Sequence, residues 1–378
     1  METTTPISCS DSYDHQDTQE SCIRGHIIAC GGGADHKDKG GERGLRKKVK
    51  RFFHSKASSN SSGVNSSSVA MASFEPSCRE KLTSSPSVVI PAAPAAACGG
   101  SNKRALLCGV TYSHQHRYML KGTANDVSNM KNLLTNTFGY PAECIRILSD
   151  DPGAQDLIPT KKNIENSLKW LVEGCKWGDS LVFYFSGHGL RQPDFQNDEI
   201  DGYDETICPV DFLKEGMILD NDINKTIVWP LKAGVKLHAI VDACHSGTIL
   251  DLEHVYDRKQ RTWINNLPPS GARKSTSGGL AISISACEDD KMAADTTVFT
   301  KKKMNGAMTY ILTETVKENP QMTYGALLDT MANHIENINN ERWIKSRIIR
   351  KVLRHKTIQE PMLSSSTKFE VYDTKFIL

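Results

Sequence analysis

The sequence predicts an α/β protein in which a mostly parallel sheet is covered by helices on both faces. From residue 103 onward, short apolar runs alternate with segments whose apolar residues recur every three or four positions. Buried strands of a parallel sheet, and the helices that cross between them, have these two patterns. The chain has 378 residues, which is long enough for such a core. No internal repeat is present, so a solenoid is excluded.

Each predicted element follows from its own pattern. The predicted strands are 104–112, 144–148, 180–185, 237–241, 280–285 and a closing strand near 368–372. The predicted helices are 125–138, 160–172, 307–316 and 324–338. The start of the second helix is the best defined, because Thr160 is a suitable N-cap and Ile164, Leu168 and Leu171 share one face. Residues 257–278 show no period and contain Pro, Gly and Ser, so they predict a loop.

The first hundred residues differ from the rest of the chain. They include a Ser/Asn-rich run at 58–68 and show no sustained period, which predicts a disordered arm. The basic run 46–51 is interpreted first as solvated charge, with a nuclear signal or an anionic-surface patch as the alternative. The predicted organisation is an arm (1–100), a large catalytic part (101–257), a linker (258–278) and a small part (279–378).

Composition excludes several classes of protein. Subtracting 44 Asp and Glu from 46 Lys and Arg leaves a net charge of +2, which does not favour a dedicated nucleic-acid binder. No apolar stretch is long enough to span a membrane, and the N-terminus lacks the features of a secretory signal. Eleven cysteines without an export signal predict reduced thiols. We therefore expect a cytoplasmic protein, with entry into the nucleus as the alternative.

Reactive side chains follow two of the predicted strands. His188 comes directly after the third strand and Cys244 directly after the fourth, each among small residues. Ligands of open α/β sheets bind at the carboxyl ends of strands, so neighbouring strands would bring the two side chains together. An imidazole can take the proton of a thiol and so create a nucleophile. The sequence predicts a cysteine–histidine dyad, with the backbone amides of Gly189 and Cys244 as donors to an oxyanion.

These residues also have less specific interpretations. Cys244 could be an inert core thiol and His188 an ordinary loop residue, although their shared position at strand ends argues against both. Ser246 does not lie in a Gly-x-Ser-x-Gly sequence, so a serine nucleophile is not favoured. His245 is not favoured as the base, because it directly follows Cys244 and adjacent side chains on a strand usually point apart. No third member of a triad is identifiable.

These motifs resemble those of the metacaspases, the caspase-like cysteine proteases of plants, fungi and protists. The resemblance lies in residues 184–189 (YFSGHG), 242–247 (DACHSG), 198–206 and 283–287, and it covers about residues 103–378. Residues 359–378 resemble the end of the plant type I small subunit. The resemblance implies the caspase–hemoglobinase fold, a three-layer α/β sandwich. It also implies cleavage after Arg or Lys, a monomer, and a role in cell-death or stress proteolysis.

Acidic residues near the strand ends predict a pocket for a basic side chain. Asp242 lies two residues before Cys244, and Asp126 lies at the start of a helix that follows the first strand. Two carboxylates would bind a guanidinium or an ammonium through charge-assisted hydrogen bonds. Asp126 could instead be an acid that favours a helix start. By resemblance, Asp126, Ser186 and Asp242 form the pocket, and Thr123 stands where many relatives carry cysteine.

A second acidic group predicts a metal site. Ten acids and one lysine occur between Asp194 and Asp222. Oxygen ligands at this density suit Ca²⁺, although composition alone favours a solvated loop. The resemblance assigns the ligands to Asp204, Asp220, Asn221 and Asp251, where many relatives have aspartate at the third position. Asn221 removes one charge, so we expect weaker affinity.

The predicted linker carries five basic residues, which are Arg258, Lys259, Arg261, Arg273 and Lys274. An enzyme that cuts after basic residues could cut itself there, and we expect calcium to trigger this. Three rival functions remain at this point. They are a non-proteolytic scaffold acting through the arm, a nucleic-acid or membrane binder acting through residues 46–51, and an asparagine-specific peptidase.

Overall fold

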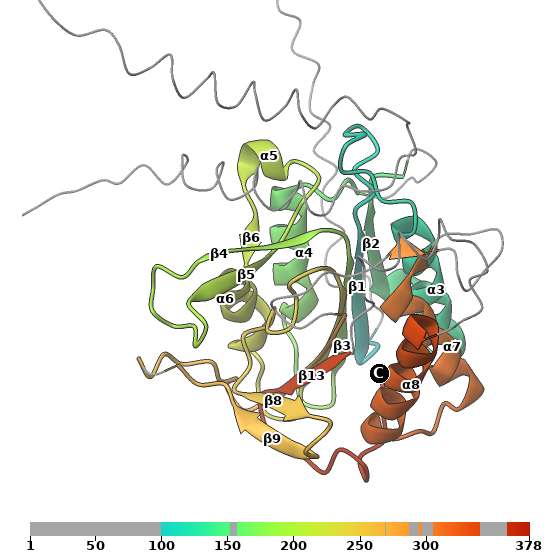
Figure 1. The fold of residues 1–378 in the computed structure, drawn as a ribbon, viewed down its shortest axis with the longest axis vertical. Helices are drawn as coiled ribbons and strands as arrows, with labels where there is room; N and C mark the ends of the chain where they lie inside the picture. The colour runs from blue at the N-terminus through green and yellow to red at the C-terminus, as the bar shows by residue number, and fades with distance from the viewer. Residues whose placement is uncertain (1–99, 152–156, 269, 287–294, 297–304, 341–360) are drawn as a thin grey trace, which may run out of the picture. The chain divides into compact units, whose positions relative to one another are not determined.

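The computed structural model describes residues 100–151, 157–268, 270–286, 295–296, 305–340 and 361–378. Eight strands among them form one sheet in the order β2-β1-β3-β7-β10-β13-β8-β9 (Figure 1). Five are mutually parallel: β2 (Ile145–Ser149), β1 (Lys103–Gly109), β3 (Ser180–Ser186), β7 (Lys236–Asp242) and β10 (Leu280–Ser285). Antiparallel pairs then add β13 (Met362–Ser365), β8 (His254–Asp257) and β9 (Thr262–Asn265). The predicted mostly parallel sheet is confirmed.

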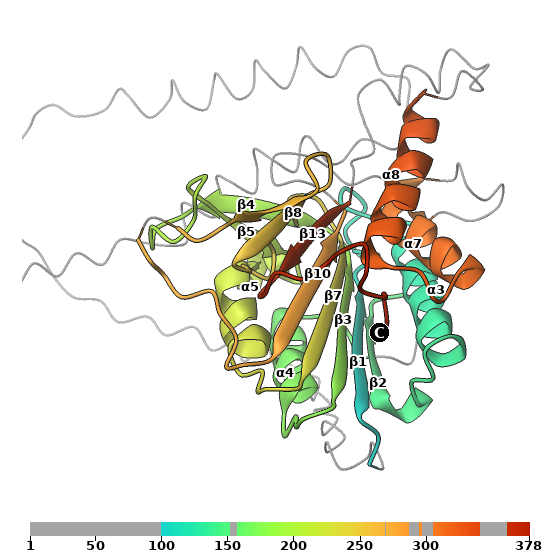
Figure 2. The ribbon, with the colours of Figure 1, turned by 90° about the horizontal axis from the view of Figure 1, so that it is seen from below.

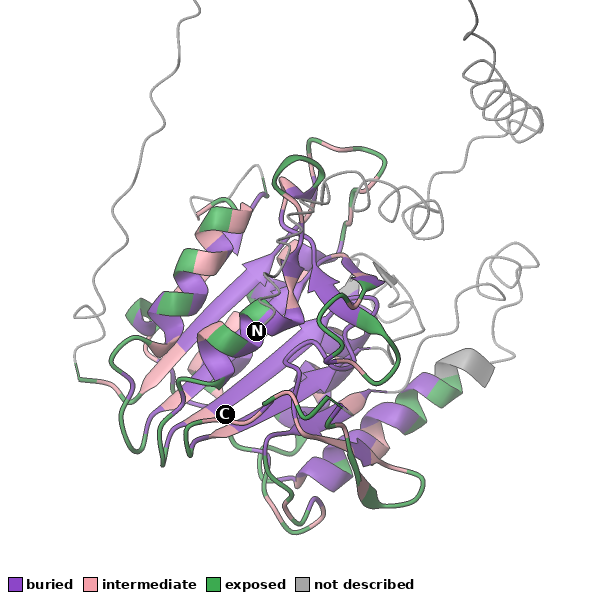
Figure 3. Cartoon of the chain, turned by 90° about the vertical axis from the view of Figure 1, so that its left-hand side faces the viewer, coloured by how far each residue is buried: buried purple, intermediate pink, exposed green. Residues whose placement is uncertain are grey.

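Helices cover both faces of this sheet, which gives the predicted three layers (Figure 2). One face carries α3 (Thr123–Asn136), α7 (Ala307–Glu318) and α8 (Tyr324–Asn340). The other carries α4 (Lys161–Val172), the short α6 (Asp220–Ile223) and the π-helical turn η3 (Asn224–Val228). The sheet between them is almost wholly buried, and the helices bury only their inner faces (Figure 3). No helix among the described residues has the length and apolarity needed to cross a bilayer.

Strand β3 shows why the apolar runs form the centre of the sheet. Phe183 and Phe185 pack with α4, whereas Val182 and Tyr184 pack into the core below α3 and α7. Successive strand side chains point to opposite faces, so a strand between two helical layers must be apolar at every position.

Helix α4 begins where the sequence predicts. The side-chain oxygen of Thr160 accepts a hydrogen bond from the Asn163 amide at 3.3 Å, as an N-cap does. Ile164, Leu168 and Leu171 are buried on one face against β1 and β3.

A small second sheet follows β3 directly. It consists of β4 (Gly189–Pro193), β5 (Tyr203–Ile207) and β6 (Ile218–Leu219). The short helix α5 (Phe212–Glu215) lies between β5 and β6. Most of the acidic residues between 194 and 222 lie in this sheet or in its connections, so this segment is more ordered than the loop that composition favours.

Two expectations about secondary structure are wrong. The closing strand is Met362–Ser365, whereas 368–372 runs through irregular backbone into a turn. The apolar alternation there reflects packing of a loop, since Phe369 lies against Trp263 and Tyr324. The stretch 257–278 is not all loop, because Thr262–Asn265 pairs with β8. The predicted arm lies outside the described residues, apart from residue 100.

Candidate active site

The two predicted reactive residues follow neighbouring strands at the same level. In the parallel pair formed by β3 and β7, Ser186 lies opposite Asp242. The two chains stay together beyond this pair, since the Gly187 amide donates to the Asp242 carbonyl at 3.3 Å. His188 and Cys244 each come two residues after the pair. Both therefore emerge at the carboxyl edge of the sheet, where α/β proteins bind ligands.

The His188 ring is held by two groups from the loop after β1. Its Nε2 lies 2.8 Å from the Tyr118 carbonyl oxygen, and its ring centroid lies 4.7 Å from that of Tyr112. A carbonyl only accepts hydrogen bonds, so Nε2 carries the proton and Nδ1 keeps the lone pair in the neutral ring. The Tyr112 hydroxyl donates to the Cys208 carbonyl at 2.7 Å and accepts from the His188 amide at 3.0 Å. These contacts orient the His188 ring. The sequence identified no residue for this role.

Gly189 lies against the backbone of Cys244. A Cβ at position 189 would come within 1.9 Å of the Cys244 carbonyl oxygen, so any side chain there would push the two segments apart. The Cys208 amide donates to the His188 carbonyl, which makes Gly189 and Ile207 a non-hydrogen-bonded pair of the antiparallel ladder. The Gly189 amide consequently points away from β5, and it has no backbone partner among the described residues.

Cys244 lies in a tight turn and is 6 % exposed. His245 has a positive φ of 49°, which turns the chain sharply after the cysteine. The Ser246 hydroxyl donates to the Ala243 carbonyl at 2.9 Å and is buried within the turn. This local role argues against Ser246 as a nucleophile.

The predicted pocket residues form one buried group. The Ser186 hydroxyl donates to Asp126 Oδ2 at 3.1 Å, and a Cβ on Gly306 would lie within 3 Å of both the Asp126 and the Asp242 carboxylates. The fourth predicted residue, Thr123, is one helical turn from Asp126 and pairs its hydroxyl with that of Thr111 at 3.2 Å.

The sequence did not reveal that the start of α7 binds both carboxylates. The Gly306 amide donates to Asp126 at 2.9 Å, and the Thr309 amide and hydroxyl donate to Asp242 Oδ2 at 2.8 and 2.7 Å. The N-terminus of a helix stabilises negative charge, so the small part of the chain holds the pocket acids in place. Only the tertiary structure brings α7 to this position.

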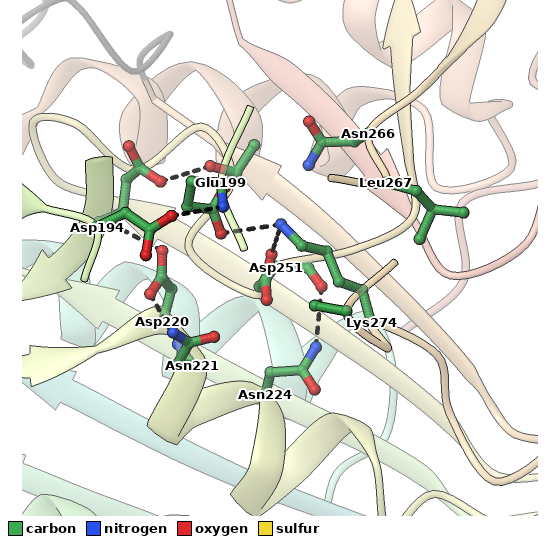
Figure 4. A network of polar contacts seen from close by, with 12 residues as sticks. Asp194, Glu199, Asp220, Asn221, Asn224, Asp251, Asn266, Leu267 and Lys274 are labelled. Atoms are coloured by element: carbon green, nitrogen blue, oxygen red, sulfur yellow. Dashed lines mark hydrogen bonds and ion pairs between the residues drawn. The ribbon is translucent and has the colours of Figure 1, made fainter. Parts of the chain in front are cut away.

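Three of the predicted metal ligands, Asp220, Asn221 and Asp251, lie in a second group of polar residues (Figure 4). We call it the acidic cluster. Its carboxylates are those of Asp194, Asp198, Glu199, Asp204, Glu205, Asp220 and Asp251. Asn221 adjoins it, and the backbone amide of Asn221 donates to Asp220 Oδ1 at 2.7 Å. Among the described residues, the carboxylate oxygens that lie within 4.8 Å of one another are those of Asp194, Asp198 and Asp204. The structure thus groups Asp204 with two acids outside the predicted set, while Asp251 lies near enough to raise the pKa of both Asp204 and Asp220.

Burial perturbs the acids of this cluster. Desolvation, followed by repulsion from neighbouring acids, raises the pKa of Asp204 to about 6 and the pKa of Asp220 well above its usual range. Asp204 Oδ1 is buried without a hydrogen-bond partner in the described residues, while Oδ2 accepts from Gln192 at 3.2 Å. Buried oxygens of this kind suit a hard cation such as Ca²⁺, because hard cations prefer oxygen ligands.

One residue of the cluster is a cation that the sequence assigned to the linker. The Lys274 ammonium contacts Asp251 Oδ1 and lies 2.9 Å from Glu199 Oε1 (Figure 4). Burial lowers the pKa of Lys274, but the two carboxylates outweigh this and raise it overall. Burial and repulsion from Asp251 still raise the pKa of Glu199 to about 9, because one ammonium cannot neutralise so many acids. Among the described residues, the cluster thus holds seven carboxyl groups and one ammonium.

Comparison with known proteins identifies the family of the chain. Residues 103–253 match the family model described as metacaspase, peptidase C14 domain. Metacaspase-1 of Arabidopsis thaliana is 44% identical over 289 residues, which cover 73% of this chain and 78% of that protein. Metacaspase-3 of the same plant is 44% identical over 281 residues, covering 73% and 75%.

Among solved structures, caspase-1 from Spodoptera frugiperda aligns with a TM-score of 0.41 at 12% identity, over 73% of this chain and 89% of that chain. The fold class rests on the sheet order and the helical layers described above. The extent and identity of the sequence matches establish that the chain belongs to the metacaspase family of cysteine-type endopeptidases.

Proposed function

We propose that this chain is a calcium-dependent endopeptidase that cleaves after Arg or Lys by means of Cys244 and His188. The observation that carries the dyad is the β3–β7 register, from which both residues emerge at the same edge of the sheet. The hydrogen bond from His188 Nε2 to the Tyr118 carbonyl supports the roles, because it leaves Nδ1 as the base.

The proposed reaction follows from these groups. His188 Nδ1 takes the thiol proton, and the Cys244 sulfur attacks the carbonyl carbon of the scissile bond. The Gly189 and Cys244 amides donate to the oxyanion that forms. The imidazolium then protonates the leaving amine as the C–N bond breaks, which leaves an acyl group on sulfur. Water, deprotonated by His188, attacks the thioester and restores the thiol.

The proposed specificity rests on charge at the edge of the pocket. Asp126 and Asp242 lie beside each other and are linked by Ser186 and Gly306. A guanidinium or ammonium of the substrate would be attracted to this pair. An asparagine-specific peptidase would not need two carboxylates there. A panel of fluorogenic peptides that differ only in the residue before the cut distinguishes the two activities.

Ca²⁺ is proposed to bind in the acidic cluster through Asp204, Asp220, Asn221 and Asp251. The ion would supply positive charge that orders the loops around the cluster, without taking part in the chemical steps. The buried Oδ1 of Asp204, which has no hydrogen-bond partner among the described residues, and the seven carboxyl groups around one ammonium support this proposal.

We expect Asp204→Asn to raise the calcium concentration needed for half-maximal activity by about tenfold, since the charge on one ligand is lost. Its amide oxygen can still accept the hydrogen bond from Gln192. Titration of Ca²⁺ against cleavage of an arginine peptide measures this. The control is Asp222→Asn, which makes the same change at an exposed position nearby. Full activity in chelator, or equal shifts in both variants, would contradict the calcium proposal.

A further inference from the structure

Lys274 places its ammonium inside the acidic cluster. Its side chain is 1% exposed, and those of its partners Asp251 and Glu199 are 4% and 5% exposed. A buried ammonium is costly unless carboxylates surround it. Lys274 meets this condition within the group of oxygens in which the cation is proposed to bind.

Lys274 also anchors a short segment, residues 270–276, which we call the strap. The Lys274 side chain turns inward, whereas the neighbouring Arg273 is exposed and bonds only to Ser275 within the described residues. Other strap hydrogen bonds are local, such as those from Gly271 to Pro268 and from Thr276 to Gly279. Within residues 270–276 the ammonium is therefore the main polar attachment to the rest of the described chain, and the strap ends just before Ser277, whose backbone amide donates to the Trp229 carbonyl at 3.1 Å.

Asp251 is fixed on the other side of this contact. The Asn224 side-chain amide donates to the carbonyls of Leu250 and Asp251, both at 2.9 Å, and Asp251 has a positive φ of 52°. Because the backbone of Asp251 is held, its carboxylate cannot follow Lys274 away from the cluster. Any ion that binds Asp251 must therefore compete with the Lys274 ammonium for the same carboxylate oxygens.

We propose that Lys274 is a tethered counter-cation of the acidic cluster, which a divalent cation displaces when it binds. This inference rests on the calcium site proposed above. Displacement supplies the cluster with two charges in place of one and releases the strap as far as Ser277, which stays bonded to Trp229. The bond after Lys274 then becomes accessible, on a residue of the type that the proposed pocket accepts. Cation binding and cutting of the strap are coupled through one side chain.

The test uses the full chain with Cys244→Ala, so that no self-cleavage occurs, and Ca²⁺ as the only ligand. Isothermal titration calorimetry compares this protein with the same chain carrying Lys274→Met, which keeps the bulk and removes the charge. Loss of the internal competitor should tighten calcium binding by about tenfold or more, as expected when the binding-competent state no longer has to be created. Arg273→Met is the matched control and should leave the affinity unchanged.

A second measurement needs no change at position 274. Reductive methylation followed by peptide mapping reports how accessible each lysine amine is. In chelator Lys274 should be protected, while the exposed Lys259 is modified. In saturating Ca²⁺ Lys274 should be modified at a rate close to that of Lys259. This measurement still decides the question if the Lys274→Met variant fails to fold without calcium.

The outcomes separate the two proposals. Calcium binding with Lys274 still protected, or with an affinity that Lys274→Met leaves unchanged or weakens, would overturn the counter-cation inference alone. A Cys244→Ala protein that binds no calcium would overturn both the inference and the proposed calcium site. Protease activity of the chain with Cys244 intact is measured separately, with Ca²⁺ and in chelator, and it tests the dyad and its calcium dependence whatever happens at Lys274.

Discussion

Replacing Cys244 by alanine is expected to lower kcat/KM on an arginine peptide by at least about 10³-fold, because no other group can carry the acyl intermediate. His188→Ala should cause a loss of similar size, since the thiol then has no base. The double variant should be no worse than either single one, because residues that act as a unit are not additive.

The matched control is Cys175→Ala. Cys175 and Cys244 are both cysteines with 6% exposure, but Cys175 lies beyond the end of α4, at the opposite end of the sheet. Its replacement should leave kcat/KM within a few-fold of the unmodified enzyme. Residual activity of Cys244→Ala at the level of this control would contradict the assignment of the nucleophile.

Asp126→Asn is expected to lower kcat/KM for an arginine peptide by about 10- to 100-fold, the effect of losing one hydrogen bond to a charged group. The amide oxygen can still accept from the Gly306 amide, so the start of α7 should stay in place.

A citrulline peptide separates recognition of charge from damage to the pocket. Citrulline has the shape of arginine without its charge, so the ratio of arginine to citrulline cleavage should fall in Asp126→Asn. An equal loss on both peptides would mean that Asp126 only supports the structure, and no loss on either would place recognition elsewhere.

The sequence predicted the central part of the fold because the patterns there are local. A strand such as β3 is apolar at each position between its ends, and α4 has both an N-cap and an apolar face. The edge of the sheet was harder. Met362–Ser365 contains only two apolar residues, and the serines that follow them are buried through hydrogen bonds such as that from Ser365 to the Ala281 carbonyl. Hydrophobic periodicity does not detect a strand of this kind.

The site was predictable to the extent that its residues directly follow strands. His188 and Cys244 could be paired because parallel strands end at a common edge. The groups that orient and neutralise the site could not be found in this way. Tyr118 contributes a backbone carbonyl, which no residue type signals, and Lys274 meets Glu199 across 75 positions of the chain. Basic residues in a segment without periodicity predict a surface loop. Only the tertiary structure shows that Lys274 is buried in the acidic cluster.

The most direct test of the central claim is covalent labelling with an arginyl chloromethyl ketone, followed by peptide mapping. The reagent carries the proposed specificity, and a thiolate displaces its chloride to form a stable thioether. We predict one adduct per chain, on Cys244, that forms in parallel with loss of activity and is abolished by His188→Ala. Inactivation accompanied by an adduct on another of the eleven cysteines, with Cys244 unmodified, would contradict the account.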